Sequence, residues 1–334
     1  MKSIALKSAV ALTAAAAFMA VSAASAADLT LKIQTHFTAE SLNGKMAAQF
    51  FGDVERISGG NIKIESFFSS AVVKSVETFD AAATGILDCD MTGSAYQPGK
   101  DAAFQFFGDL LGGYNTPDQQ RAWLEIGGGR ALADELYPRF GMHLVGFWGG
   151  VPESLSSTKS LAGPADLKNW KFRSPPGMET EIFAAFGASP IVMDFGEVFT
   201  ALNTGMVDGA DYSQLNNNVS IGLYEIATHA TYPGWHSMPS DHLACNKGVW
   251  DGMTESQRAT IKIAFDKMAY DMFTQSKIEA DKAAAKLIAE GKVTLHQWSA
   301  EDLRTYRIAV RKVWTKWAKK SEMAGRVVES HLAF

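Results

Sequence analysis

The chain contains little cysteine and, beyond its first residues, no long apolar run. Only two of the 334 residues are cysteine, which rules out a disulfide-stapled scaffold. Cys89 and Cys245 both lie in apolar, strand-like stretches. This setting favours two buried free thiols, although export would permit a disulfide between them. No stretch after residues 1–26 reaches the ~18 uninterrupted apolar residues of a membrane-spanning helix.

Basic charge is in short supply as well. The chain carries 31 Lys and Arg against 36 Asp and Glu, a formal net charge of −5. Nucleic acids and anionic membrane surfaces attract clustered positive charge. This balance therefore argues against nucleic acid as a partner.

Known catalytic motifs are missing too. The sequence has no HExxH, GxSxG or Walker loop and no clustered Cys/His spacing for a metal. The glycines at 127–129 follow a helical segment rather than a strand, so we interpret them as a break between helices and not as a phosphate-binding loop. An exported hydrolase or isomerase would have to use Asp211 or Glu153 as base and Arg173 as anchor, without any nucleophile-plus-base arrangement. We therefore expect that the protein is not an enzyme.

The N-terminus carries an export signal. Lys2 and Lys7 precede an apolar run over 9–21, and Ala24-Ser25-Ala26 has the small-x-small pattern that signal peptidase cleaves. Residues 1–26 are therefore predicted to be a signal peptide. The remaining chain is long enough for two domains.

Two segments of the chain echo each other at a spacing of 120 residues. SVETFDAAATGILDCDMTG (75–93) and FGEVFTALNTGMVDGADYS (195–213) align without a gap. Each has a helical segment, 76–83 or 198–203, then a Thr-Gly turn and an apolar strand beginning at residue 86 or 206. The similarity has two possible origins: common descent of the two segments, or chance combined with the turn and strand features that unrelated α/β units share. Either way the pattern predicts two α/β lobes.

Further strands and helices fit the same scheme. Strands are predicted at 29–37, 61–68, 143–148 and 170–175, and helices at 42–57 and 178–186. Alternating helices and strands favour mostly parallel sheets, one for each copy of the unit. Ligands gather at the carboxyl ends of such strands. The two echoed strands end near 91–96 and 210–213, which predicts a cleft between two facing sheet edges.

The residues at these strand ends suggest a binding site. Arg173 closes the strand-like WKFRSP and is stiffened by Pro175 and Pro176, so its guanidinium could hold a carboxylate through two parallel hydrogen bonds. A surface ion pair is the alternative for this arginine. Aromatic and acidic side chains would complete a small pocket, namely Tyr96, Asp211, Tyr212 and Trp235.

Two longer segments resemble a known family. KFRSPPGMETEIFAAFGASPIVMDFGEVFTALNTGMVDGADYS (171–213) and YEIATHATYPGWHSMP (224–239) are similar to the DctP-type solute-binding proteins of TRAP (tripartite ATP-independent periplasmic) transporters. The branch that the chain resembles most binds 2-oxoacids and related monocarboxylates. The likeness extends to FFGDLLGG, the GGG at 127–129 and the helical tail.

The resemblance implies a fold, a location and a function. The fold would be α/β and similar to class II periplasmic binding proteins, with two lobes joined by crossing strands and long hinge and C-terminal helices. The protein would capture a small organic carboxylate in the periplasm and deliver it to a sodium-driven TRAP membrane permease. By position, Arg173 matches the family arginine that clamps the ligand carboxylate, and Tyr96 matches a tyrosine on the ligand. Asp211 and Tyr212 match an acidic and an aromatic residue beside the ligand, sometimes with a bound cation such as Na⁺ or Ca²⁺.

The sequence also departs from the 2-oxoacid branch. That branch has Gln where this chain has Glu153, Glu near the position of His242, and Glu in place of the shorter Asp211. We count Glu153 and His242 among the candidate ligand-binding residues. A zwitterionic carboxylate, which brings its own positive group, is therefore the alternative ligand to a 2-oxoacid with a metal ion.

The interpretation as a two-lobe receptor also predicts the lobe boundaries. Lobe one is expected to comprise residues 27–150 plus 241–298, and lobe two residues 151–240. The C-terminal segment 299–334 places Tyr306, Val310, Val313 and Trp317 at helical spacing. This apolar face should pack across the lobes or pair with a second subunit to form a homodimer.

Overall fold

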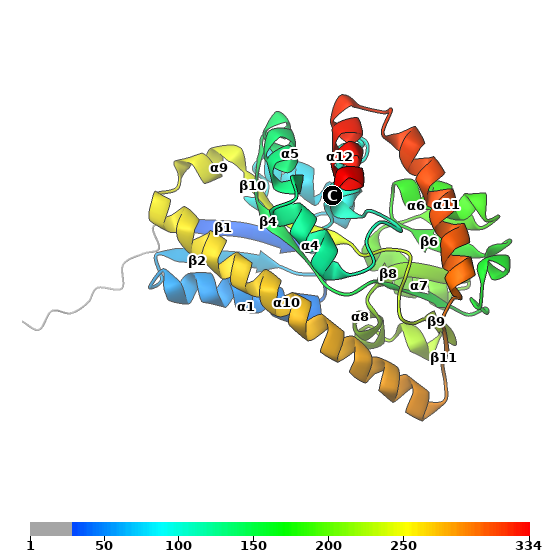
Figure 1. Cartoon of the computed structure of the whole chain (residues 1–334). Coiled ribbons are helices and arrows are strands. Elements are labelled where there is room, and N and C mark those ends of the chain that lie inside the picture. The colour runs from blue at the N-terminus through cyan, green and yellow to red at the C-terminus, as the bar shows by residue number, and fades with distance from the viewer. Residues whose placement is uncertain (1–28) are drawn as a thin grey trace, which may run out of the picture.

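The computed structural model describes residues 29–334, which form two β-sheets surrounded by helices (Figure 1). The predicted signal peptide lies outside the described residues. Within 29–334, no helix combines the length and the apolar character needed to cross a membrane. The α-helices are α1 Leu42–Ile57, α2 Thr78–Ala83, α3 Ala103–Gly108, α4 Pro117–Glu125, α5 Gly129–Leu136, α6 Met178–Ala185, α7 Val198–Asn203, α8 Leu215–Ser220, α9 Lys247–Gly252, α10 Glu255–Glu290, α11 Ala300–Trp317 and α12 Glu322–Ala333.

The first sheet has the strand order β2-β1-β3-β10-β4. Its strands are β1 Leu29–Thr35, β2 Ile62–Phe67, β3 Cys89–Met91, β4 Met142–Gly149 and β10 Ser240–Asn246. β1 pairs in parallel with β2 and β3, and α1 connects β1 to β2 as predicted. The Ser41 side chain accepts a hydrogen bond from the Gly44 N–H and caps α1, whose Phe50 is fully buried against the sheet.

The second sheet has the order β11-β9-β5-β8-β6-β7. Its strands are β5 Ser154–Ser157, β6 Lys171–Ser174, β7 Ser189–Val192, β8 Gly209–Ser213, β9 His229–Thr231 and β11 Thr294–His296. The predicted lobe boundaries stay a prediction. The sheets show that the chain enters the second sheet through 150–153 and returns through 232–239, and that β11 lies in the second sheet. We call 150–153 and 232–239 the crossing segments.

Both sheets are mostly parallel, as expected, and each contains a single antiparallel strand. β10 runs antiparallel to β3 and β4, and β5 runs antiparallel to β8 and β9. The reason is that β5 and β10 arrive directly from the other sheet, rather than through a helical crossover that returns the chain to its starting edge. Apart from β9 and β11, the parallel pairs belong to the helix-and-strand units.

The echoed segments fold alike down to single hydrogen bonds. Each forms a helix that ends at a left-handed glycine, as predicted, with φ of 84° at Gly85 and 71° at Gly205. Asp88 then accepts a hydrogen bond from the Lys32 N–H, and Asp208 accepts one from the N–H of Lys171. These aspartates occupy the turn, so β3 and β8 begin three residues later than predicted.

The two cysteines form a disulfide, so the expectation of free thiols was wrong. Cys89 in β3 and Cys245 in β10 are direct antiparallel partners, both fully buried, with sulfurs 2.05 Å apart. The pairing could not be seen in the sequence because 156 positions separate them. Register alone brings the two sulfurs together.

Long C-terminal helices hold the two sheets together (Figure 1). α10 packs on α1 and β4 beside the first sheet and on α8 beside the second. α11 packs on α6, whereas α12 packs on α3 and α5. The four apolar residues predicted to face inward from 299–334 are all buried, namely Tyr306, Val310, Val313 and Trp317. This segment thus packs across both parts of the chain.

Candidate functional site

A polar pocket lies between the ends of the echoed strands and the crossing segments. We call it the central pocket. Its volume is about 40 Å³, room for roughly three waters at ~10–15 Å³ each. Three predicted residues that follow or end the echoed strands line it: Tyr96, Asp211 and Tyr212. Glu153, in the first crossing segment, lines it as well.

Buried carboxyl groups dominate this pocket. Asp109, Glu153, Glu179, Asp211 and Asp241 line it, and each is at most 7% exposed. Burial raises the pKa of Asp109 and of Asp241 to about 8, and raises the pKa of Glu153 and Glu179 well above the usual range. Burial therefore favours the protonated form of these four carboxyl groups.

Asp211 is the exception among these acids. Burial alone would raise its pKa, but His236 and Arg173 hold the pKa below the ordinary value. His236 is fully buried, and its Nε2 lies 3.1 Å from Asp211 Oδ1 and 3.7 Å from Glu179 Oε1. Asp211 thus carries the negative charge of the cluster.

Ser237 supports this assignment of protons. Its Oγ lies 2.9 Å from Asp109 Oδ2 and 2.9 Å from Glu153 Oε2. A hydroxyl has one hydrogen to donate, so it can donate to only one of the two carboxyl groups. The other must be protonated and donate to Ser237. The geometry agrees with the raised pKa values of both acids.

Three of these side chains could hold a cation. One ligand atom each from Glu153, Asp211 and His236 lies within 4.8 Å of the others. Carboxylate oxygens suit Na⁺ or Ca²⁺, and the imidazole also suits transition metals. The set fits a cation, and it includes Asp211 from the predicted metal ligands. Tyr212 is not in the set; its ring stacks on Phe195 at 3.9 Å between centroids.

Arg173 is only 2% exposed and is not itself among the residues that line the central pocket, but its guanidinium contacts two residues that are, Asp211 and Phe195. Its Nε donates to the Met193 carbonyl at 3.1 Å, and its Nη1 donates to the Asp211 carbonyl at 2.7 Å. Burial raises the pKa of Tyr96, and the nearby Arg173 charge opposes that shift. Among residues 29–334 Arg173 makes no ion pair with a side chain, so the surface ion pair considered above does not form.

The structure does not bring His242 or Trp235 to the central pocket. His242 is fully buried in the first sheet, where Nε2 lies 2.7 Å from Asp90 Oδ2 and Nδ1 lies 2.7 Å from the Tyr137 hydroxyl. Successive residues of a strand point to opposite faces, and in β10 it is Asp241 that lines the pocket. The Trp235 ring instead stacks on Trp298, 3.8 Å away.

The sequence prediction missed several residues of this site. His36, Asp109, Glu179 and Asp241 line the central pocket, and His236 completes the charged cluster. One signal was present, because Asp109 interrupts the apolar FQFFGDLLGG. A charged residue within an apolar run needs a buried polar partner. The ligand-binding roles of all these residues stay predictions.

Comparison with known proteins agrees with the fold. A monocarboxylate 2-oxoacid-binding periplasmic protein of Nostoc sp. is 28% identical over 215 residues, 63% of this chain and 58% of the relative. A TRAP periplasmic solute-binding protein of Rhodobacter sphaeroides, in an apo open structure, is 32% identical with a TM-score of 0.71 over 91% of this chain and 96% of that one.

A second solved structure shares the fold at lower identity. It is a TRAP periplasmic solute-binding protein of Pseudoalteromonas atlantica with bound sodium and pyruvate, 24% identical, with a TM-score of 0.80 over 91% of this chain and 93% of that one. The model of the DctP family, described as bacterial extracellular solute-binding protein, family 7, matches residues 34–321. With this match over most of its length, the chain belongs to the DctP family of extracellular solute-binding proteins.

Proposed function

We propose that this protein is the periplasmic receptor of a TRAP transporter, which captures a small organic carboxylate and delivers it to the membrane permease. The observation that carries the proposal is the setting of Arg173. Its guanidinium is buried at the end of β6 and fixed by two backbone carbonyls. A preorganised guanidinium of this kind suits a carboxylate. Proteins of this family are receptors and not enzymes.

The ligand that we propose is a 2-oxoacid or a related monocarboxylate, bound together with a cation. An incoming carboxylate would meet the negative charge of Asp211, and two buried anions without a counterion would repel each other at a cost of several kcal/mol. A Na⁺ or Ca²⁺ ion held by Asp211 and Glu153 would bridge the ligand to the protein, and Glu153 would release its proton when the ion binds. The relative that binds pyruvate with sodium supports this arrangement.

A zwitterionic carboxylate is the second candidate. The observation in its favour is that five buried carboxyl groups line the central pocket while a single guanidinium lies beside it. A ligand ammonium group would occupy the place of the metal and interact with Asp211. Carboxylate recognition by Arg173 would be the same for both ligands.

Closure of the two lobes over the ligand would provide the transport signal. Across the pocket, Asn217 Nδ2 donates to Asn43 Oδ1 at 2.7 Å, and the Met178 N–H donates to Gln105 Oε1 at 3.0 Å. Contacts made only when the lobes meet favour the closed state, and a bound ligand adds to them. No covalent bond is made or broken in this cycle.

Titration calorimetry with pyruvate in sodium buffer tests the proposal. We expect binding in the micromolar range or tighter for the mature protein, and recovery of unchanged pyruvate after prolonged incubation. Conversion of pyruvate would overturn the receptor assignment. Failure to bind pyruvate, with tight binding of a zwitterionic carboxylate, would support the second candidate.

A further inference from the structure

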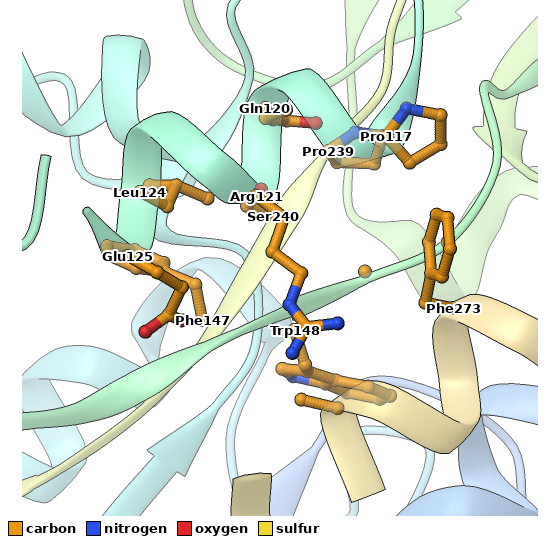
Figure 2. A pocket seen from close by; sticks show the side chains of 13 residues that line it. Pro117, Gln120, Arg121, Leu124, Glu125, Phe147, Trp148, Pro239, Ser240 and Phe273 are labelled. Atoms are coloured by element: carbon orange, nitrogen blue, oxygen red, sulfur yellow. The ribbon is translucent and has the colours of Figure 1, made fainter. Parts of the chain in front are cut away.

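A second pocket lies against the same crossing segments, between α4 and α10 (Figure 2). We call it the rear pocket. Gly149 and Pro239 line both the rear pocket and the central pocket, so the two pockets share part of a wall. The volume of the rear pocket is also about 40 Å³. Leu124, Trp148 and Phe273 give it apolar surface, and the exposed Glu125 of α4 lines it as well.

The rear pocket contains one cationic side chain without an ion pair. Arg121 reaches from α4 into the pocket (Figure 2). Among residues 29–334 its guanidinium makes no hydrogen bond and no ion pair, and its only charge-related contact is with the Tyr270 ring, 5.4 Å from guanidinium carbon to centroid. Arg121 is exposed, so water can hydrate its guanidinium, and an anion entering the pocket could replace that water.

The wall of the rear pocket also holds an unsatisfied donor. Trp148 is 2% exposed, and its Nε1–H has no hydrogen-bond partner in the described part of the chain. Burying an N–H without a partner costs free energy, and such groups usually have a partner in folded proteins. The apolar surface, the free guanidinium and the unsatisfied N–H together suit a small monocarboxylate with an apolar body.

The shared wall connects the two pockets mechanically. A Cβ atom at Gly149 would lie 2.5 Å from the Pro239 carbonyl oxygen. The backbone just before the first crossing segment therefore contacts the backbone at the end of the second. The Trp148 ring lines the rear pocket and also packs edge-on against Phe37, a residue of the central pocket, at 5.8 Å between centroids. Pro239 belongs to a crossing segment, so a rotation of one lobe against the other that moves Pro239 would change the shape of both pockets.

We propose that the rear pocket is a second ligand site, for a small monocarboxylate with an apolar body, and that its occupancy shifts the equilibrium between open and closed states. The site rests on Arg121 and Trp148 alone. The coupling rests in addition on the proposed receptor function. Coupling between two sites is reciprocal, so a rear-pocket ligand changes the affinity of the central pocket by the same factor as the reverse.

Calorimetry with benzoate as the probe tests the site. Benzoate is titrated into the wild-type protein, Arg121→Gln, Arg173→Lys and the control Arg304→Gln, which alters an exposed arginine on α11. We expect benzoate binding that persists in Arg173→Lys and Arg304→Gln and weakens at least about tenfold in Arg121→Gln. Equal affinity in Arg121→Gln, loss of binding in Arg173→Lys, or no binding at millimolar benzoate would each overturn the site.

The coupling has its own readout. Saturating benzoate should change the pyruvate affinity of the wild-type protein at least about twofold, and this effect should vanish in Arg121→Gln. An unchanged pyruvate affinity would overturn the coupling but leave the site. If pyruvate does not bind at all, the proposed function fails while the benzoate titrations still decide the rear pocket.

Discussion

The Asp194 carboxylate accepts hydrogen bonds from both the backbone N–H and the hydroxyl of Ser75, 119 positions earlier in the chain, at 2.9 and 2.5 Å. Its other oxygen accepts from the Gly196 N–H at 3.0 Å. Ser75 opens the first echoed helix and Gly196 lies in the first turn of the second. One carboxylate therefore caps both copies of the unit and joins them to each other.

Replacing Asp194 should favour the open state. We expect Asp194→Ala to weaken pyruvate binding about tenfold, because charge-assisted hydrogen bonds are worth roughly 1.5 to 3 kcal/mol each. Small-angle scattering should show a larger radius of gyration than for the wild-type protein under the same conditions. Glu197→Gln is the control, since its ion pair with Lys74 is exposed and worth little. Equal effects of the two changes would contradict the role given to Asp194.

Arg173→Lys should weaken carboxylate binding by more than about tenfold, because a lysine cannot reproduce a bidentate charge-assisted contact worth roughly 1.5 to 3 kcal/mol. Calorimetry compares it with Arg304→Lys, which changes an exposed arginine. Thermal unfolding shows whether the variant is folded. Equal carboxylate affinities of Arg173→Lys and the wild-type protein would contradict the proposal that Arg173 holds the ligand carboxylate.

Cation removal separates the two ligand candidates. If a metal bridges Asp211 to a 2-oxoacid, pyruvate affinity should fall on chelation in sodium-free buffer and collapse in Asp211→Ala. Asp118→Ala, at an exposed position on α4, serves as the control. The 2-oxoacid assignment would be rejected by two results together: a pyruvate affinity that does not change on cation removal, and tight binding of a zwitterion that depends on Asp211.

The raised pKa of Asp109 predicts a pH dependence of stability. Burial raises this pKa from 3.8 to about 8, so the folded protein binds a proton that the unfolded chain releases above pH 4. The contribution of Asp109 to stability is therefore complete below about pH 4 and is lost as pH rises toward 8. Asp109→Asn mimics the protonated acid, so it should gain thermal stability relative to the wild-type protein when both move from pH 5 to pH 8. Melting curves for wild type, Asp109→Asn and Asp118→Asn check this. A constant difference between Asp109→Asn and wild type would contradict the prediction.

Loss of the disulfide should lower stability. We expect the Cys89→Ala, Cys245→Ala double variant to unfold with a free energy about 2–4 kcal/mol smaller, because the bond restricts a long loop of the unfolded chain. Denaturant unfolding with and without reductant measures this. Reductant should destabilise the wild-type protein and leave the variant unchanged. A wild-type protein insensitive to reductant after denaturation would contradict the prediction.

The sequence predicted the local units and the two mostly parallel sheets, but not which distant side chains meet at the site. The Thr-Gly turns, α1 and the strand-end placement of Tyr96 and Asp211 follow from short-range patterns. In contrast, Asp109 and Glu179 come from distant elements and meet only in the folded chain. Which of Asp241 and His242 faces the pocket depends on the register of β10, and a shift of one residue exchanges the two faces.

The bond between Cys89 and Cys245 closes a covalent ring that contains both crossing segments and every strand of the second sheet except β11. A protease that cuts the chain once between these cysteines opens the ring without releasing a fragment. In a compartment exposed to extracellular proteases, the two halves of a nicked molecule would stay attached to each other. The same bond fixes β10 to β3, so rotation of the second lobe cannot separate β10 from the first sheet. The backbone changes that accompany such a rotation must therefore occur in the crossing segments, 150–153 and 232–239.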